Sequence, residues 1–185
     1  MIFDLPTSVE FGGKSWEIET DYRVILKVLL AFDDPDLEDQ DKAFICLYNI
    51  YKDVEKIPHA QYQEAFDAAI RFIDRDQDNS KPGPRTMDWE QDAPIIFPAI
   101  NHVAGMEVRA VPYLHWWTFM GYFMEIKDST ASTVFGLRSK KARGKKMEKW
   151  EREYWQQNIS ICKLKPKESE EDKAEKERLK QLLGG

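Results

Sequence analysis

The chain has 185 residues, of which 42% are hydrophobic and 12% aromatic, so it is long enough to bury a real core in one domain. Residues 1–100 carry 21 acids and 10 bases, whereas residues 101–185 carry 12 acids and 17 bases. No stretch approaches the roughly 18 apolar residues of a membrane-spanning helix, and the N-terminus lacks the features of a secretory signal. We therefore expect an intracellular protein with halves of opposite charge, which pack together or join copies head to tail.

The first 19 residues show the alternation of apolar and polar residues that is typical of two short strands. Val9 and Phe11 alternate with polar residues before Gly12-Gly13, and Trp16 and Ile18 alternate after them. Two glycines tolerate the positive φ angles of a tight hairpin turn. Because two strands alone are only marginally stable, this β-hairpin must pack on helices or pair with another chain. It is a candidate assembly edge.

Between residues 20 and 73 the apolar period changes from two to about 3.6 residues, which predicts three helices with one buried face each. Thr20 or Asp21 caps the first helix, Asp39 or Asp41 opens the second, and Pro58 separates the second from the third. The expected buried stripes are Tyr22, Ile25, Leu26, Leu29 and Leu30; then Phe44, Leu47, Tyr48, Tyr51 and Val54; and then Tyr62, Phe66, Ala69, Ile70 and Ile73.

Residues 74–88 form a charged loop with two prolines and no apolar period, the best internal boundary in the chain. A fourth helix follows over 88–103. Because Pro94 and Pro98 each lack a backbone donor, we expect a kink in this helix or a late start near Ala93.

The stretch from Pro112 to Ile126 is nearly apolar all round, which predicts a helix buried on most sides at the centre of the fold. Ser129 or Thr130 caps a short helix that runs through Leu137. A last helix carries Met147, Trp150, Tyr154 and Trp155, and after Lys163 the chain is dense in both charge signs. We predict a mainly α protein: a single domain of about six helices over residues 1–162 with the hairpin at 1–19, and a charged, disordered tail over 163–185.

The residue types that most often act in catalysis or metal binding do not occur at the spacings of a catalytic or metal-binding motif. Asp74, Asp76 and Asp78 open a calcium-loop pattern, but Asn79 and Arg85 stand where its glycine and closing glutamate belong. The histidines, His59, His102 and His115, have no ligand spacing, and Cys46 and Cys162 are expected to be buried thiols. We predict no enzyme activity, no catalytic residues, no bound metal and no cofactor.

A basic run is a further candidate for partner binding. It comprises Arg138, Lys140, Lys141, Arg143, Lys145, Lys146 and Lys149, with the aromatic residues Trp150 and Trp155 close behind. Such a run can neutralise nucleic-acid phosphates, or it can meet an acidic partner or the acidic half of the chain. The pI of about 5.2 and the lack of a nucleic-acid-binding motif argue against nucleic acid, and so favour the acidic half of the chain or an acidic partner.

Four segments together resemble a known family. They are DAPIIFPAI at 92–100, LHWWTFMGYF at 114–123, STVFGLRSKK at 132–141 and GKKMEKWEREYWQQN at 144–158. The chain is similar in these segments to the tail assembly chaperones of siphophages that infect Gram-positive bacteria. The likeness covers most of residues 1–160.

The resemblance implies a protein made from a gene between those for the major tail protein and the tape measure protein. It implies a helical, non-catalytic chaperone that coats the tape measure protein, keeps it soluble, and helps recruit major tail tube subunits. Self-association along the client is expected, in the host bacterial cytoplasm, and the finished virion is expected to lack the protein. The alternative is a nucleic-acid-associated phage protein that uses the basic run at 138–149.

Overall fold

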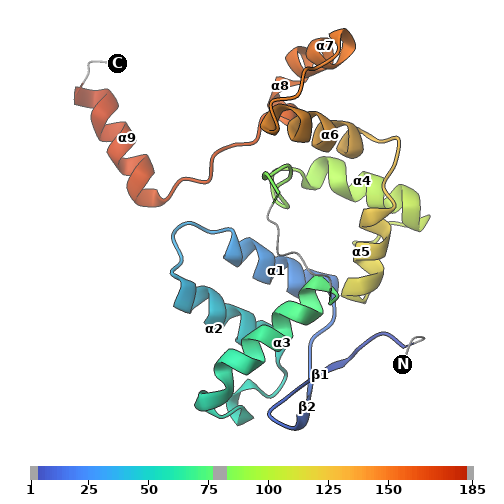
Figure 1. Ribbon diagram of the computed structural model, residues 1–185, viewed down its shortest axis with the longest axis vertical. Helices are drawn as coiled ribbons and strands as arrows, with labels where there is room; N and C mark the ends of the chain where they lie inside the picture. The colour runs from blue at the N-terminus through green and yellow to red at the C-terminus, as the bar shows by residue number, and fades with distance from the viewer. Residues whose placement is uncertain (1–3, 77–82, 183–185) are drawn as a thin grey trace.

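The structure is a computed structural model that describes residues 4–76 and 83–182 (Figure 1). Over these ranges the chain folds into nine α-helices and one β-hairpin. The prediction of a mainly helical chain with an N-terminal hairpin is therefore confirmed, whereas the expected number of about six helices was too low. The difference arises late in the chain, where α8 and α9 follow the predicted last helix, α7, and α9 lies in the segment that was expected to be disordered.

The hairpin pairs β1 (Ser8–Phe11) with β2 (Lys14–Glu17) in an antiparallel register that places Val9 opposite Trp16. Gly12 and Gly13 have φ angles of 57° and 71°, as a two-residue hairpin turn requires. Phe11 stacks on Trp16 with ring centroids 5.2 Å apart and meets the edge of the Tyr51 ring at 5.6 Å. The hairpin is thus fastened to the helical body by its apolar face.

Three helices follow: α1 (Tyr22–Phe32), α2 (Asp39–Ile50) and α3 (Tyr62–Asp74). The Asp21 carboxylate caps α1 by accepting the Arg23 N–H, as expected. Two 3-10 turns, η1 (Val54–Lys56) and η2 (His59–Gln61), flank Pro58 between α2 and α3. Helix α1 packs on α2, α2 packs on α3, and α3 also contacts β1.

The predicted buried face of α2 was partly wrong. Phe44 and Tyr48 are 52% and 53% exposed, because α2 buries Cys46, Leu47 and Ile50 and ends at Ile50. The rings of Phe44 and Tyr48 instead lie against each other on the flank of the helix, with centroids 4.0 Å apart.

Helix α4 (Ala93–Ala104) begins late, as its two prolines predicted. Helix α5 (Trp116–Met124) is shorter and less buried than expected: Pro112 lies before it, and within it only Trp116 and Phe119 are buried. The helix begins at Trp116 because the His115 Nδ1 accepts the Trp117 N–H at its N-cap. Helix α5 packs on α1 and α4, and thus lies in the main core although one of its faces meets solvent.

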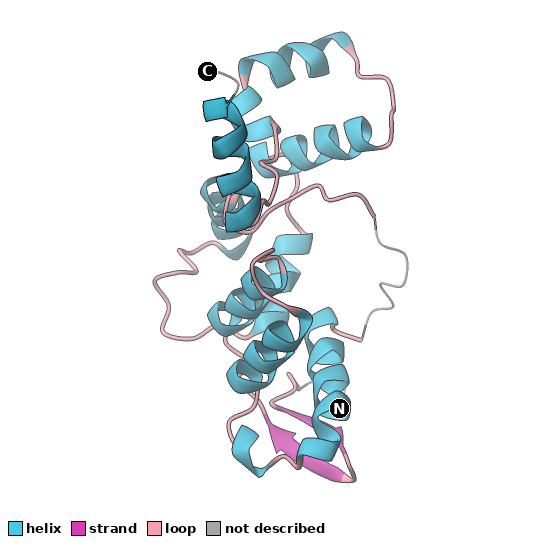
Figure 2. Cartoon of the chain, turned by 90° about the vertical axis from the view of Figure 1, so that its left-hand side faces the viewer, coloured by secondary structure: helices cyan, strands magenta, loops and turns pink. Residues whose placement is uncertain are grey.

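The last helices are α6 (Thr130–Ala142), α7 (Lys149–Gln157), α8 (Ile159–Cys162) and α9 (Glu170–Leu182). Helices α6, α7 and α8 lie at one end of the molecule and the hairpin at the other, as both views show (Figures 1 and 2). Residues 163–169 are extended, and α9 projects from the body (Figure 1). Within the described ranges, no helix is long and apolar enough to span a membrane.

Candidate functional site

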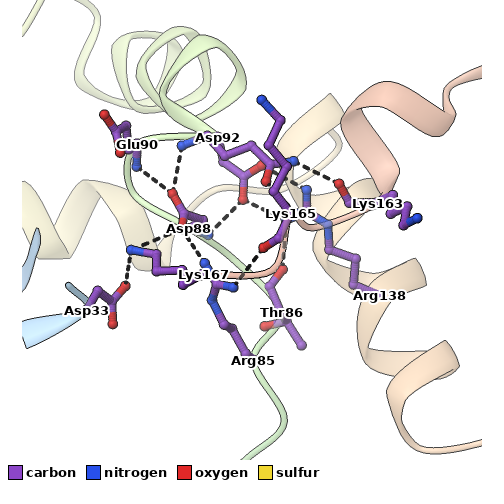
Figure 3. Close-up of polar contacts among 11 residues, drawn as sticks. Asp33, Arg85, Thr86, Asp88, Glu90, Asp92, Arg138, Lys163, Lys165 and Lys167 are labelled. Carbon is purple, nitrogen blue, oxygen red and sulfur yellow. Dashed lines mark hydrogen bonds and ion pairs between the residues drawn. The ribbon is translucent and has the colours of Figure 1, made fainter. Parts of the chain in front are cut away.

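The first residue of the basic run lies inside the protein. Arg138 is 4% exposed and donates two hydrogen bonds to the Asp92 carboxylate, with N···O distances of 2.6 and 2.8 Å (Figure 3). It also donates to the carbonyls of Thr86, Ile161 and Cys162 at 3.0, 2.6 and 2.9 Å. A buried guanidinium needs this full set of partners, because desolvation of an unpaired charge is costly. Arg138 therefore joins α6, α8 and the loop before α4, and its guanidinium is not exposed at the protein surface.

A second buried carboxylate extends this polar junction. Asp88 accepts the backbone N–H groups of Glu90 and Gln91 at 2.9 and 2.7 Å, and it pairs with the guanidinium of Arg85 and the ammonium of Lys167 (Figure 3). Burial raises the pKa of Asp88, but the Gln91 N–H and the Lys167 charge lower it more, so the net pKa lies below its ordinary value. Asp88 is thus ionised at neutral pH.

Residues 163–170 form what we call the strap, which crosses the body from α8 to the α1–α2 connection. The side chain of Gln91 donates to the Lys163 carbonyl and accepts the Lys165 N–H, both at 2.9 Å. Lys167 bridges Asp88 and Asp33, at N···O distances of 3.3 and 3.2 Å. At the end of the strap, the Glu170 N–H donates to the Asp36 carboxylate at 2.8 Å.

Two lysines and one tryptophan of the expected binding set are engaged within the protein. The Lys140 ammonium lies 2.6 Å from the Glu151 carboxylate and holds the pKa of that carboxyl below its ordinary value. The Lys141 ammonium lies over the half-buried Trp155 ring, 4.2 Å from its centroid. These contacts fasten α6 to α7, so the three side chains have a structural role in the free protein.

The remaining residues of the run form an exposed basic surface at the α6–α7 turn. We define this surface by Arg143, Lys145, Lys146, Lys149 and Trp150, all of them exposed. The Trp150 ring is 57% exposed, an unusual position for so large an apolar group. Four cations beside an uncovered aromatic ring can bind an acidic surface that offers an apolar contact.

A second surface was missed by the sequence analysis. Helices α2 and α3 enclose a groove of about 830 Å³. We call it the apolar groove; its apolar lining residues are Phe32, Ala43, Phe44, Leu47, Tyr62, Phe66 and Ile70. The signal for it was present in the sequence, because the apolar residues of α2 form two competing stripes, one through Cys46 and Ile50 and one through Phe44 and Tyr48. We assigned the second stripe to the core, whereas the structure exposes it.

The other candidate chemical groups are engaged or buried. His115 is buried, with its Nε2 2.9 Å from the Pro6 carbonyl. Burial raises the pKa of the Cys46 thiol to about 12, and burial also raises the pKa of Cys162, an effect that the Arg138 charge opposes. Asp78 and Asn79 of the acidic loop lie outside the described residues. Across residues 4–76 and 83–182, no three acidic, histidine or cysteine side chains are placed to hold a metal ion.

In a comparison with family models, residues 1–165 match the family described as Bacteriophage Gp15 protein. The match covers the hairpin, helices α1 to α8 and the first residues of the strap, and it ends before α9. Neither a curated protein nor a solved structure matches the chain.

Proposed function

The chain belongs to the Bacteriophage Gp15 protein family, and on that premise we propose that it is a tail assembly chaperone. In this proposal it binds the tape measure protein, keeps it soluble, and helps recruit major tail tube subunits without catalysing a reaction. It acts in the host bacterial cytoplasm and leaves before the virion is complete.

The segments that resemble tail assembly chaperones support the proposal because they belong to neighbouring elements. Residues 92–100 lie mostly in α4, 114–123 in α5, 132–141 in α6 and 144–158 mostly in α7. Helix α4 contacts both α5 and α6, and Lys140 ties α6 to α7. The resemblance therefore covers one contiguous part of the fold.

The observation that carries the proposal is the separation of charge toward opposite ends of the molecule. Residues 4–76, which form the hairpin and helices α1 to α3, have 17 acids and 8 bases. The basic surface lies at the other end, at the α6–α7 turn (Figures 1 and 2). Opposite ends of opposite charge favour head-to-tail contacts between copies, and such contacts propagate when their rotation does not close a ring. A row of copies is the form that a chaperone for a long filamentous client needs.

Co-expression with the tape measure protein of the same phage tests the proposal. We expect the tape measure protein to stay soluble and to copurify with the chain in a fixed ratio. The proposal is wrong if the tape measure protein is equally insoluble with and without the chain. Copurification with DNA or RNA in place of the tape measure protein would favour the nucleic-acid alternative.

A charge reversal tests the head-to-tail contact. Arg143, Lys145, Lys146 and Lys149 are replaced by glutamate, while Lys140 and Lys141 are kept because they support α7. We expect the larger species seen at low salt by sedimentation to disappear in this variant. The matched control reverses four exposed lysines at the other end, Lys14, Lys27, Lys52 and Lys56, and should still associate. Equal association of both variants would contradict the contact.

A further inference from the structure

We infer that the apolar groove between α2 and α3 binds the client, and that it takes an amphipathic helix with an apolar stripe and basic residues toward one end. This inference rests on the proposed function, since it names the client-binding surface and the kind of segment that fits it. The groove is separate from the basic surface, which lies at the opposite end of the molecule (Figures 1 and 2).

The groove has the composition of a recognition site for an apolar stripe. Leu47 is almost fully buried in its floor, and Phe32 meets Phe66 edge-on with ring centroids 6.1 Å apart. Phe44 forms part of the wall and is half exposed, and it leans on the equally exposed Tyr48. Apolar rings left in contact with water on one flank of a helix gain most from a partner that covers them.

The occupant is a helix because the groove offers side chains and few free backbone groups. Both walls are α-helices, whose N–H and C=O groups beyond the first and last turns are bonded within the helix. An extended strand laid on these walls would leave its own N–H and C=O groups without partners against apolar rings, at a large cost. A helix satisfies its backbone internally and presents apolar side chains at i, i+3, i+4 and i+7, as helix-in-groove recognition requires.

The charge of the occupant follows from the residues around the groove. The connection from Asp33 to Asp41, which continues into α2 beside Phe32, has six acids and no base. Asp39 belongs both to this connection and to the groove lining. On the α3 side, the lining residue Gln63 donates a hydrogen bond to the carboxylate of a second acid, Asp67, at 2.9 Å. The lining also contains one lysine, Lys42. Basic residues at one end of a client helix are therefore attracted to the α1–α2 connection, which orients that helix along the groove.

Peptides of about 25 residues that tile the tape measure protein of the same phage provide the probe, with binding to the intact chain measured by fluorescence anisotropy. We expect the bound peptides to share an apolar helical stripe and Lys or Arg toward one end, and to gain helicity on binding. Selection of acidic peptides, or of peptides without a helical stripe, would overturn the inference.

Matched aromatic variants locate the binding. Phe44→Glu should weaken peptide binding by at least about tenfold, because it places a charge in the groove wall. Tyr113→Glu, at an equally exposed ring outside the groove lining, should leave the affinity unchanged. Both rings face solvent, so we expect both variants to fold, and thermal melting checks this. Equal weakening by both variants, or by Tyr113→Glu alone, would overturn the groove assignment.

A charge exchange provides a gain of binding that a folding defect cannot mimic. Asp39→Lys with Asp67→Lys should weaken binding of the basic peptides, and it should strengthen binding of the same peptides with their Lys and Arg replaced by Glu. Absence of that reversal would remove the orienting role of Asp39 and Asp67.

The outcomes separate this inference from the proposed function. If Phe44→Glu still solubilises the tape measure protein as the unchanged chain does, the groove inference is wrong and the chaperone function stands. If the unchanged chain fails to solubilise that protein, the chaperone function is wrong. In that case the groove inference is still tested by the peptide panel, together with the Phe44→Glu and charge-exchange variants. These measurements show whether the groove binds helices with basic residues toward one end.

Discussion

The two ends of the molecule are stabilised by different kinds of interaction. The lower part, formed by the hairpin and helices α1 to α5, has a large aromatic core in which Tyr22 stacks on Phe119 with ring centroids 4.3 Å apart. The upper part, formed by α6, α7 and α8, has a small apolar cluster whose buried members are Val134, Leu137 and Cys162.

The polar junction around Arg138 adds specific contacts to the small apolar cluster of the upper part. Its bonds to Asp92 and to three carbonyls cross from α6 to α8 and to the loop before α4 (Figure 3). An apolar core loses stability in proportion to the buried apolar surface that a substitution removes. In a buried ion pair, replacing one partner leaves the other charge buried and unpaired, so the whole interaction is lost. We expect the lower part to behave as the stable body and the upper part as an element that opens separately.

The largest effect should come from the aromatic core. Trp116→Ala removes a fully buried ring and the hydrogen bond from its Nε1 to the Ile73 carbonyl at 2.8 Å. We expect a loss of about 4 to 5 kcal/mol in the free energy of unfolding, because a cavity adds to the lost burial. Denaturation in urea measures it. Trp150→Ala, at an exposed ring, is the control and should change stability by less than about 0.5 kcal/mol. Similar losses in the two variants would contradict the assigned core.

A smaller and more local loss should follow Arg138→Met. The change leaves Asp92 buried without its cation, at a cost of about 3 kcal/mol. Hydrogen exchange should accelerate in α6, α7 and α8 and stay slow in α1 and α3. The double variant Arg138→Met with Asp92→Leu should recover most of the loss, because no unpaired charge remains. Uniform acceleration over the whole chain would show that the two ends unfold together.

Structural features that depend only on neighbouring residues in the chain could be predicted from the sequence. Period and capping are local, so the hairpin turn at Gly12-Gly13 and the late start of α4 at Ala93 were predicted correctly. Part of the apolar core also followed from helical spacing, since Tyr22, Ile25, Leu47 and Ile73 are buried. These features need only residues close together in the chain.

The errors concern contacts between distant residues. Arg138 lies in a run of surface bases and was read as one of them, but its partner Asp92 is 46 positions away. Phe44 and Tyr48 fit a buried stripe as well as Cys46 and Ile50 do, and the packing of α1 and α3 decides which face is covered. The apolar groove depends on that choice, because it leaves Phe44 in the groove wall. The two competing stripes are visible in the sequence, but contacts between distant residues decide which of them is covered.

As the pH is lowered, the strap should detach from the body before the aromatic core unfolds. The pKa of Asp88 in the folded protein lies below its ordinary value of 3.8, so its pairing with Lys167 and the Gln91 N–H stabilises the fold above pH about 4. This stabilisation is lost as the pH falls through the lowered pKa. A fluorescent label on the strap should therefore gain mobility below pH about 4, while tryptophan emission from the core stays constant. Asp88→Asn should abolish that step, and a step that persists in this variant would assign it to another carboxylate.

The smallest effect should come from the contact between Lys141 and Trp155, which lies at the surface of the upper part. Its cation–π geometry, with 4.2 Å from the ammonium to the ring centroid, is worth about 0.5–1 kcal/mol at an exposed site. A double-mutant cycle with Lys141→Met and Trp155→Leu isolates this coupling from the loss of packing. Lys149 and Glu153 provide the comparison, because their exposed pair has a longer N···O distance of 3.9 Å and should couple more weakly. Equal couplings would mean that Lys141 adds no more than a solvated charge, and that α7 is held to α6 by Lys140, Glu151 and its apolar contacts.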